Sequence, residues 1–276
     1  MKLATVRTPG GTRAVRVTDG GCVDLGVPDV GALLARDGWA AEAAAASSDT
    51  FPLRAADAAP VVPRPGKVWC VGLNYRNHIL EMGRDLPEYP TLFAKFADAL
   101  IGARDAIELA PESSAVDWEA ELAVVIGRTV RRASEEDAVA AIAGFTVIND
   151  VTMRDWQFRT REWLQGKTFE ATTPLGPVMV TPDELPGGVR PRLTMTCAVN
   201  GEAMQKAGTA DLVFDPVALV RYASVITTLR PGDVIATGTP GGVGHARTPA
   251  RYLADGDVVV TEIDGIGRLE NVATAS

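Results

Sequence analysis

From Lys67 onward the chain is a succession of short, β-branched segments that are bounded by Gly, Pro, Asn or Asp. Segments of this kind predict strands. A parallel α/β fold would need a helix between most of them, and the sequence lacks those helices. We therefore expect a β-rich α+β fold, a mixed β-roll or sandwich covered by a few helices. The expected strands are KVWCVGLNY, EAELAVVIG, AGFTVIND, GPVMVTP, LTMTCAVNG, GDVIATGT and GDVVVTEIDGIGRL.

Two helices are expected in this body, in SEEDAVAAIAG with Ser134 as N-cap and in DPVALVRYASVITTL with Asp215 as N-cap and Pro216 in the first turn. The leading residues predict short strands (KLATVRT, TRAVRVTDG) followed by short helices (DVGALLARDG, WAAEAAAASS). The proline-rich stretch PVVPRPGK excludes a helix and predicts a boundary. We expect a small N-terminal α+β domain over 1–62 and a catalytic domain over 63–276.

Composition limits the possible partners and location. The net charge of −8 over 276 residues, without a basic run, argues against nucleic acid. No apolar stretch approaches the ~20 residues of a membrane helix, and MKLATVRTPGG lacks the apolar core of a signal peptide. Cys22, Cys70 and Cys197 match neither a zinc spacing nor a disulfide framework. We therefore expect buried thiols, a cytoplasmic location and a small-molecule substrate.

Glu119 and Glu121 open an otherwise apolar strand. Because residues i and i+2 of a strand face the same side, these acids project together, away from Trp118, Ala120 and Leu122. A solvated acidic face is the simplest interpretation. A second strand, GFTVIND, ends on Asp150. Three carboxylates without a nearby histidine or cysteine would favour Mg²⁺, Mn²⁺ or Ca²⁺.

Three more polar residues follow these acids. If DVTMRDWQF turns helically, Arg154 and Gln157 share a face with Asp150 and could contact a metal-bound ligand or water. Lys167 in LQGKTFE could offset surplus negative charge and bind an anionic substrate. Its alternative is an ordinary surface lysine.

His78 and Glu81 lie three residues apart in GLNYRNHILEMG, the spacing of one helical turn. A carboxylate beside an imidazole orients it and makes it a better base. The alternative is a surface pair of negligible energy. His245 is expected in a loop without a role.

The glycines of GTPGGVGHA lack dinucleotide-binding spacing, and GKT at 166–168 lacks the glycine that a phosphate-binding loop needs. These glycines are instead expected to let the backbone pass close to a ligand. Gly238 and Thr239 would then contact substrate, Thr239 through its hydroxyl and N–H.

Taken together, these stretches resemble the fumarylacetoacetate hydrolase family over roughly 66–272, within the subgroup of acylpyruvases and 2-hydroxyhepta-2,4-diene-1,7-dioate isomerases. The matching blocks, in order, are GLNYRNHILEMG, DWEAELAVVIG, GFTVINDVTMRDWQ, GKTFEATTPLGP, VNGE, PGDVIATGTPGGVG and GDVVVTEIDGIG. The resemblance implies the family's mixed β-roll and a homodimer. It also implies that ILEMGRDLPEYP is a segment that closes over substrate.

The resemblance further implies roles for individual residues. Glu119, Glu121 and Asp150 match the ligands of Mg²⁺ or Mn²⁺, for which Ca²⁺ can substitute in crystals. Some members add a fourth acid upstream of the histidine, and KVWCVGL offers none. The remaining matches are Lys167 and Gln157 beside the metal, Thr239 on the substrate carboxylate, and the dyad of His78 and Glu81.

The function implied by the resemblance is hydrolysis of a carbon–carbon bond in a ketonic substance, as in aromatic catabolism. An acylpyruvate-type 2,4-diketo acid would yield pyruvate and a carboxylic acid, with His78 activating water. An alternative is decarboxylation or isomerisation of a 2-oxo diacid, such as oxaloacetate or 2-hydroxyhepta-2,4-dienedioate, at the same metal site. A third hypothesis is a ligand-binding or structural module with a vestigial site.

Overall fold

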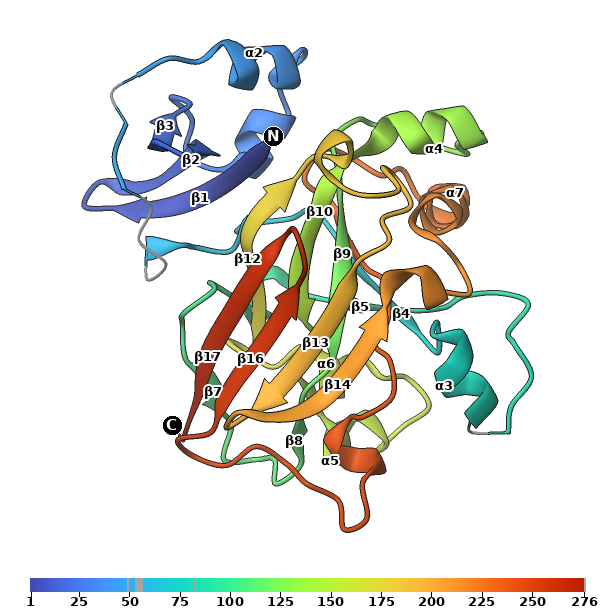
Figure 1. Cartoon of the computed structure of the whole chain (residues 1–276). Helices are drawn as coiled ribbons and strands as arrows, with labels where there is room; N and C mark the ends of the chain where they lie inside the picture. Colours follow the sequence, from blue (N-terminus) through green and yellow to red (C-terminus); the bar gives the residue numbers. More distant parts are fainter. Residues whose placement is uncertain (49, 53–56, 82, 276) are drawn as a thin grey trace.

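The computed structural model describes residues 1–48, 50–52, 57–81 and 83–275. A large mixed sheet forms its centre (Figure 1). In spatial order its strands are β3 (Gly21–Asp24), β2 (Gly11–Thr18), β1 (Lys2–Thr8), β12 (Thr173–Val180), β10 (Ile142–Asn149), β9 (Ala120–Ile126), β15 (Val234–Ala236), β4 (Val68–Gly72) and β5 (Thr91–Lys95). The short strand β6 (Leu100–Ile101) pairs with β12.

A second sheet covers one face of the first. In spatial order its strands are β14 (Glu202–Gly208), β13 (Thr194–Val199), β16 (Val258–Ile263), β17 (Gly267–Ala275) and β7 (Ile107–Leu109). The segment GDVVVTEIDGIGRL, expected as one strand, is instead a hairpin of β16 and β17. Gly265 adopts φ +77° in its turn, a conformation that suits glycine. Two short strands, β8 (Val116–Asp117) and β11 (Thr152–Met153), pair separately.

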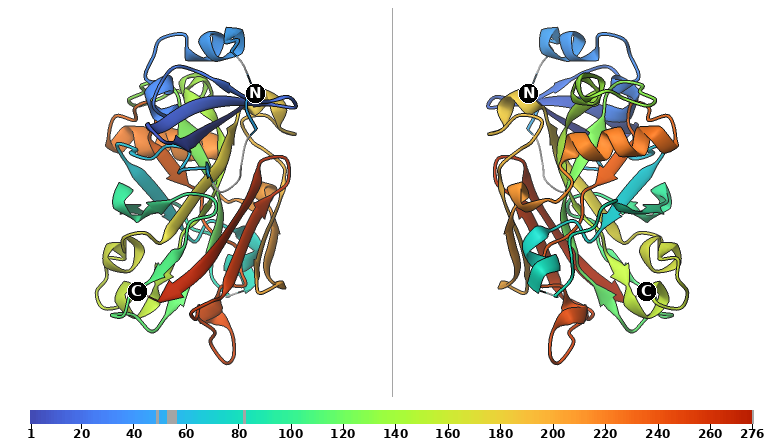
Figure 2. Two further views of the ribbon diagram at one scale, coloured as in Figure 1. Left: turned by 90° about the vertical axis from the view of Figure 1, so that its left-hand side faces the viewer. Right: turned by 90° about the vertical axis from the view of Figure 1, so that its right-hand side faces the viewer.

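The two sheets pack face to face, as the side views show (Figure 2). One hydrophobic core lies between the sheets. It contains Leu122 and Phe145 from the first sheet, Trp118 from the segment just before β9, and Met195 and Leu269 from the second sheet. A second core lies on the opposite face of the large sheet, against the N-terminal segment. Strands β9 and β10 are buried along their whole length because both faces are covered. This double coverage explains their nearly continuous apolar sequence.

The two predicted helices of the body are confirmed at their expected starts. The Ser134 hydroxyl accepts a hydrogen bond from the Asp137 N–H at 3.1 Å, and the Asp215 carboxylate accepts one from the Ala218 N–H at 2.9 Å. The helices are α1 (Val30–Leu34), α2 (Trp39–Ala45), α3 (Arg76–Glu81), α4 (Glu135–Ala141), α5 (Arg154–Gln157), α6 (Leu164–Lys167) and α7 (Pro216–Ile226). Single 3₁₀ turns are η2 (Ala97–Ala99), η3 (Pro182–Glu184), η4 (Thr209–Asp211) and η5 (Gly244–Ala246).

The N-terminal strands continue the large sheet, since β1 pairs with β12. The proline-rich stretch PVVPRPGK forms no helix, as predicted, and the Val61 N–H donates to the Leu175 carbonyl at 3.1 Å. The division at 62/63 stays a prediction. All three cysteines are buried, as expected. The described helices include none long and apolar enough to span a membrane.

Candidate metal centre

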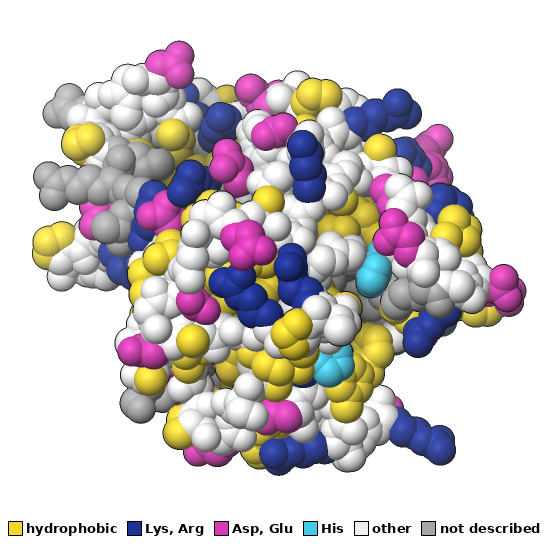
Figure 3. Space-filling model, turned by 60° about the horizontal axis from the view of Figure 1, so that its bottom comes forward, with side chains coloured by type: hydrophobic (Ala, Val, Ile, Leu, Met, Phe, Trp, Pro, Cys, Tyr) yellow, Lys and Arg dark blue, Asp and Glu magenta, His cyan; other side chains and the backbone are white. Residues whose placement is uncertain are grey.

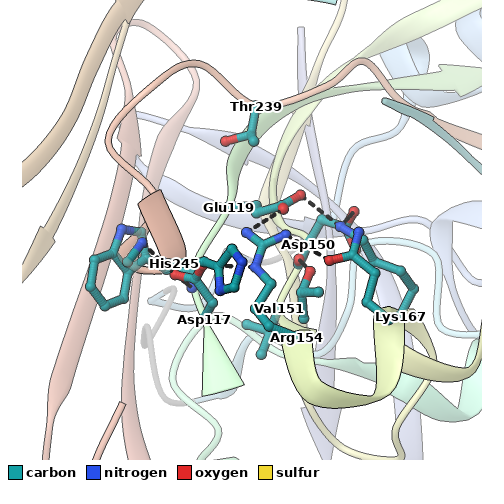
Figure 4. Close-up of polar contacts among 12 residues, drawn as sticks. Asp117, Glu119, Asp150, Val151, Arg154, Lys167, Thr239 and His245 are labelled. Atoms are coloured by element: carbon teal, nitrogen blue, oxygen red, sulfur yellow. Dashed lines mark hydrogen bonds and ion pairs between the residues drawn. The ribbon is translucent and has the colours of Figure 1, made fainter. Parts of the chain in front are cut away.

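Three carboxylates meet at one end of the paired strands β9 and β10. Because Asn149 pairs with Ala120, Glu119 just before β9 lies beside Asp150 just after β10 (Figure 4). The Asp150 N–H donates to the Glu119 carbonyl at 2.8 Å. One oxygen each of Glu119, Glu121 and Asp150 lies within 4.8 Å of the others. The acids therefore converge as the sequence predicts, while their role as metal ligands stays a prediction.

These acids are buried. The exposed fractions are 6% for Glu119, 1% for Glu121 and 0% for Asp150, so the simpler interpretation of a solvated acidic face is wrong. Trp118 and Leu122, on the other side of the strand, belong to the core between the sheets. Burying carboxylates is costly unless cations and hydrogen bonds compensate them.

Two buried lysines provide that compensation. Lys167, at the end of α6, donates to Glu119 Oε2 at 2.7 Å and to Asp150 Oδ2 at 2.8 Å. Only 1% of Lys167 is exposed, so the alternative of a surface lysine is wrong. Lys95, at the end of β5, donates to Asp150 Oδ1 at 2.6 Å and to the Val151 carbonyl at 2.9 Å. Sequence reasoning missed Lys95, and the only available signal was a lysine inside the apolar run TLFAKFA.

The acids differ in their electrostatics. Burial raises the pKa of Glu121 well above its ordinary value, with Asp150 and Glu119 adding to the rise and Lys167 opposing it. Burial also pushes the pKa of Asp150 upward, but Lys167 and then Lys95 outweigh it and hold that pKa below its usual value. A divalent cation at this position would stabilise the charged form of Glu121.

Arg154 forms a second buried ion-pair group. Its Nε lies 2.8 Å from Asp117 Oδ2 and its Nη2 lies 2.6 Å from Glu119 Oε1. Its Nη1 donates to Gln157 Oε1 at 3.0 Å. The expectation of one helix from Asp150 to Gln157 is wrong, because Thr152–Met153 form β11 and helix α5 begins only at Arg154. Asp117, which sequence reasoning also missed, pairs with Arg154 and accepts from the N–H groups of Trp118, Gly244 and His245.

The glycine-rich loop after β15 packs against the acids. The Gly238 N–H donates to Glu121 Oε2 at 2.7 Å. Gly238 has φ +102°, and a Cβ there would lie 2.8 Å from the Val71 carbonyl oxygen, so glycine is required. The Thr239 hydroxyl donates to the Ala120 carbonyl at 2.9 Å and accepts from Gln205 at 2.8 Å. Its N–H has no backbone acceptor among the described residues.

His78 lies on α3, at the edge of the same region. The predicted helical turn joins His78 and Glu81, but no hydrogen bond links their side chains within the described part of the chain. Burial lowers the pKa of His78, while Glu81 and then Glu119 oppose that change. The imidazole is therefore predominantly neutral at pH 7 and can accept a proton. His245, expected without a role, lies in η5 with its Nδ1 at 2.8 Å from the Tyr252 hydroxyl.

A cavity of about 310 Å³ lies beside the acid cluster, and Glu119 is the acid of the cluster that lines it. The two histidines of the chain show on one face of the molecule, with hydrophobic side chains between them (Figure 3). The polar or charged residues that line the cavity are His78, Arg84, Glu119, Arg154, Gln157, Lys167 and Thr239. Its apolar wall includes Phe93, Phe158 and Trp163. His78 also lines a neighbouring polar cavity of about 470 Å³ together with Glu81.

The acid cluster fits a hard divalent cation. Oxygens bound to one Mg²⁺, Mn²⁺ or Ca²⁺ at about 2.1 to 2.6 Å lie about 3 to 5 Å apart, which matches the spacing of these carboxylates. The cluster contains only oxygen donors, so zinc and copper are disfavoured. Glu119, Glu121 and Asp150 could hold the cation, with Gly238 and Lys167 orienting them.

The match to known proteins agrees with this site and fold. The profile of the fumarylacetoacetate (FAA) hydrolase C-terminal domain matches residues 67–274. The chain therefore belongs to the fumarylacetoacetate hydrolase family of enzymes, and the resemblance seen in its motifs is confirmed. The β-rich α+β fold expected from the sequence is confirmed as well.

Particular relatives differ in their reactions. Over 212 residues the chain is 47% identical to oxaloacetate tautomerase FAHD2A, mitochondrial, of Bos taurus, covering 76% of this chain and 67% of that protein. The structure of fumarylacetoacetate hydrolase from Exiguobacterium antarcticum is similar at 34% identity and a TM-score of 0.88, covering 100% of both chains. Maleylpyruvate hydrolase of Sphingobium sp. SYK-6, solved with manganese(II) and pyruvate, is similar at 28% identity and a TM-score of 0.80, again covering 100% of both chains.

Proposed function

We propose that this protein catalyses keto–enol tautomerisation of a 2-oxo diacid of the oxaloacetate type, with Mg²⁺ or Mn²⁺ at Glu119, Glu121 and Asp150. The observation that carries the proposal is the convergence of the three buried acids, one of which, Glu119, lines the same cavity as His78. The 47% identity to a bovine oxaloacetate tautomerase supports this reaction over hydrolysis. The isomerase alternative considered from the sequence is thus preferred to C–C hydrolysis.

When bound, the divalent cation would act as a Lewis acid that polarises the 2-oxo group of the substrate. The Lys167 ammonium, fixed by two carboxylates, would stabilise negative charge that develops on the 2-oxo oxygen. The open N–H of Thr239 would donate to the substrate's C1 carboxylate. The buried polar residues of the lining, which we call the cavity floor, are Glu119, Arg154, Gln157 and Lys167. The Arg154–Gln157 pair would hold the substrate against this floor.

His78 would move the proton that tautomerisation requires. In the keto-to-enol direction its neutral imidazole would remove a proton from C3 as the C3–H bond breaks, and the imidazolium would then return that proton to the 2-oxo oxygen, which gives the enol and neutral His78. The reverse reaction returns a proton to C3. No water needs to attack carbon, so the reaction does not require the dyad of His78 and Glu81 to be hydrogen-bonded.

The test is an assay of enol oxaloacetate with Mg²⁺ or Mn²⁺. Loss of enol absorbance should exceed that of a matched sample without protein, and it should stop when a chelator removes the metal. Pyruvate is measured in the same sample, because its release would reveal decarboxylation. Enol decay at the protein-free rate with either metal would contradict the proposal.

Hydrolysis of an acylpyruvate-type diketo acid is the second candidate. It is supported by the structural similarity to maleylpyruvate hydrolase and by His78 and Glu81 lining the same polar cavity. A panel of diketo acids, followed through loss of diketone absorbance and pyruvate release, separates the two. Hydrolysis without enol turnover would favour this candidate. The vestigial-site hypothesis predicts no calorimetric Mn²⁺ binding to the wild type, and Glu119→Ala is the matched non-binding control.

We also propose a homodimer and a cytoplasmic location, which rest on the family resemblance and the composition. The bovine relative is a mitochondrial protein, so location needs its own experiment. Light scattering at several protein concentrations tests the dimer, and cell fractionation tests the location.

A further inference from the structure

The charges at the metal centre match one substrate carboxylate and leave a second one unbalanced. The acid cluster and its ion-pair partners are Asp117, Glu119, Glu121, Asp150, Lys95, Lys167 and Arg154. With every group ionised, these side chains carry one net negative charge. A divalent cation would convert this into one net positive charge, which one carboxylate neutralises. A diacid therefore needs a further cation for its distal carboxylate.

The cations on the cavity floor are already engaged. Lys167 binds Glu119 and Asp150, and Arg154 binds Asp117 and Glu119. Neither can turn toward a distal carboxylate without leaving a buried acid unpaired, which is costly. The cavity has one more basic residue of permanent charge in its lining, Arg84.

The C-terminal end of helix α3 places Arg84 at this cavity. The Gly83 N–H donates to the Leu80 carbonyl at 2.9 Å and the Arg84 N–H donates to the Ile79 carbonyl at 3.2 Å. This pair of bonds is a Schellman motif, with Gly83 in the left-handed conformation at φ +67°. The motif turns the chain sharply after α3 and fixes the backbone from which the Arg84 side chain reaches the cavity lining.

The Arg84 guanidinium is also available to bind a ligand. No carboxylate of the described residues forms an ion pair with its guanidinium, in contrast to Lys167 and Arg154. Arg84 is exposed, whereas the residues of the floor are buried, and we call this exposed part of the lining, together with the half-buried His78, the cavity mouth. A guanidinium can bind a carboxylate through two parallel hydrogen bonds, which gives both affinity and orientation.

We propose that Arg84 binds the distal carboxylate of a 2-oxo diacid and thereby selects diacids over monoacids at this site. The inference rests on the proposed function, and it names a specificity-determining residue for that reaction. Substrate would lie with its 2-oxo carboxylate end at the acid cluster and its other end at the mouth beside Arg84.

The experiment compares oxaloacetate with its 4-methyl ester, which has the same carbon skeleton without the distal charge. The variants are Arg84→Gln, Arg84→Lys and, as control, Arg76→Gln, because Arg76 is exposed on α3 and does not line the cavity. Arg84→Gln should lower kcat/KM for oxaloacetate about tenfold and leave the ester within about twofold. The kcat/KM of Arg84→Lys for oxaloacetate should lie between those of wild type and Arg84→Gln, and the kcat/KM of Arg76→Gln should equal that of wild type.

A binding measurement separates this inference from the proposed function. Calorimetry with Mg²⁺ present compares 3,3-dimethyloxaloacetate with 3,3-dimethyl-2-oxobutanoate, neither of which can enolise. Arg84→Gln should weaken binding of the diacid about tenfold and leave the monoacid unchanged. If wild type turns over neither oxaloacetate nor its ester, the proposed function fails, and this measurement still decides the role of Arg84. Equal effects of Arg84→Gln on both ligands, or no effect on either, would overturn the inference.

Discussion

Glu119, Glu121 and Asp150 lie at the ends of strands that are buried throughout, whereas His78 lies on a six-residue helix at the edge of the molecule. The register of β9 and β10 fixes the acids, and buried lysines form ion pairs with Glu119 and Asp150. The position of the histidine, in contrast, depends only on a short helix and on how that helix ends. The cavity floor is therefore part of the folding core, and its mouth is not. Substitutions at the floor should change stability and activity together, while those at the mouth should change activity alone.

The largest effect is expected for Asp150→Ala, which removes an ion-pair partner of Lys167 on the floor. It leaves Lys95 and Lys167 buried without a shared carboxylate, which should cost about 3–5 kcal/mol of unfolding free energy and abolish turnover. Urea denaturation of metal-free protein measures the stability. The control is Asp155→Ala, an exposed acid bonded to Ser113, which should lose less than about 1 kcal/mol. Equal midpoints for the two variants would show that the floor is not part of the core.

His78→Asn at the mouth should lower the rate of deuterium exchange at C3 of oxaloacetate by about 10²- to 10⁴-fold. Its unfolding free energy should change by less than about 1 kcal/mol. Burial lowers the pKa of His78 below 6.5, so the neutral, proton-accepting form predominates at pH 7. In wild type, kcat/KM should therefore fall only as the pH drops below about 6.5, and the variant should lack that acid limb. An unchanged limb in His78→Asn would assign it to another group.

Gly238→Ala tests the junction between floor and mouth. A Cβ at φ +102° and 2.8 Å from the Val71 carbonyl oxygen forces the loop to shift, which moves the N–H that binds Glu121. Mn²⁺ affinity, measured by calorimetry, should fall about tenfold, with a loss of about 1–3 kcal/mol in stability. Gly10→Ala is the matched control, because a Cβ at Gly10 meets nothing within 4 Å. Undiminished Mn²⁺ affinity would mean that Gly238 does not orient the ligand.

The smallest effect is expected for Glu81→Gln. Glu81 raises the pKa of His78, so its removal should shift the acid limb of the pH profile to lower pH. Tautomerisation at pH 7 should change by less than about fivefold, because His78 is already neutral there. A loss of two or more orders of magnitude, measured beside wild type at the same pH, would instead favour hydrolysis through the dyad.

The sequence was informative where function depends on local order. Alternation along one strand and the end of the next predicted that Glu119, Glu121 and Asp150 converge, and residue types predicted the helix caps at Ser134 and Asp215. Lys95 escaped prediction because it reaches Asp150 through the pairing of β5 with β4 at the far side of the sheet. Its local pattern offers a single signal, a lysine within the apolar run TLFAKFA, and that signal does not indicate its partner.

Short elements limited the prediction in another way. A helical period over 150–157 placed Arg154 near Asp150, but the pairing of β11 with β8 replaced the first half of that helix. The ion pair between Arg154 and Asp117 spans 37 residues and depends on that pairing. The N-terminal strands were predicted individually, yet their union with the main sheet depends on long-range contacts with β12.

Asp150 accepts from a different lysine at each of its oxygens. The chain thus carries two ammonium groups that already hold this acid in place before any ion arrives. If these acids bind a metal as proposed, we expect the chain to fold without it, unlike a zinc finger, which unfolds once its metal is withdrawn. A chelator should remove the metal and leave the fold intact, and added magnesium or manganese should restore activity without refolding.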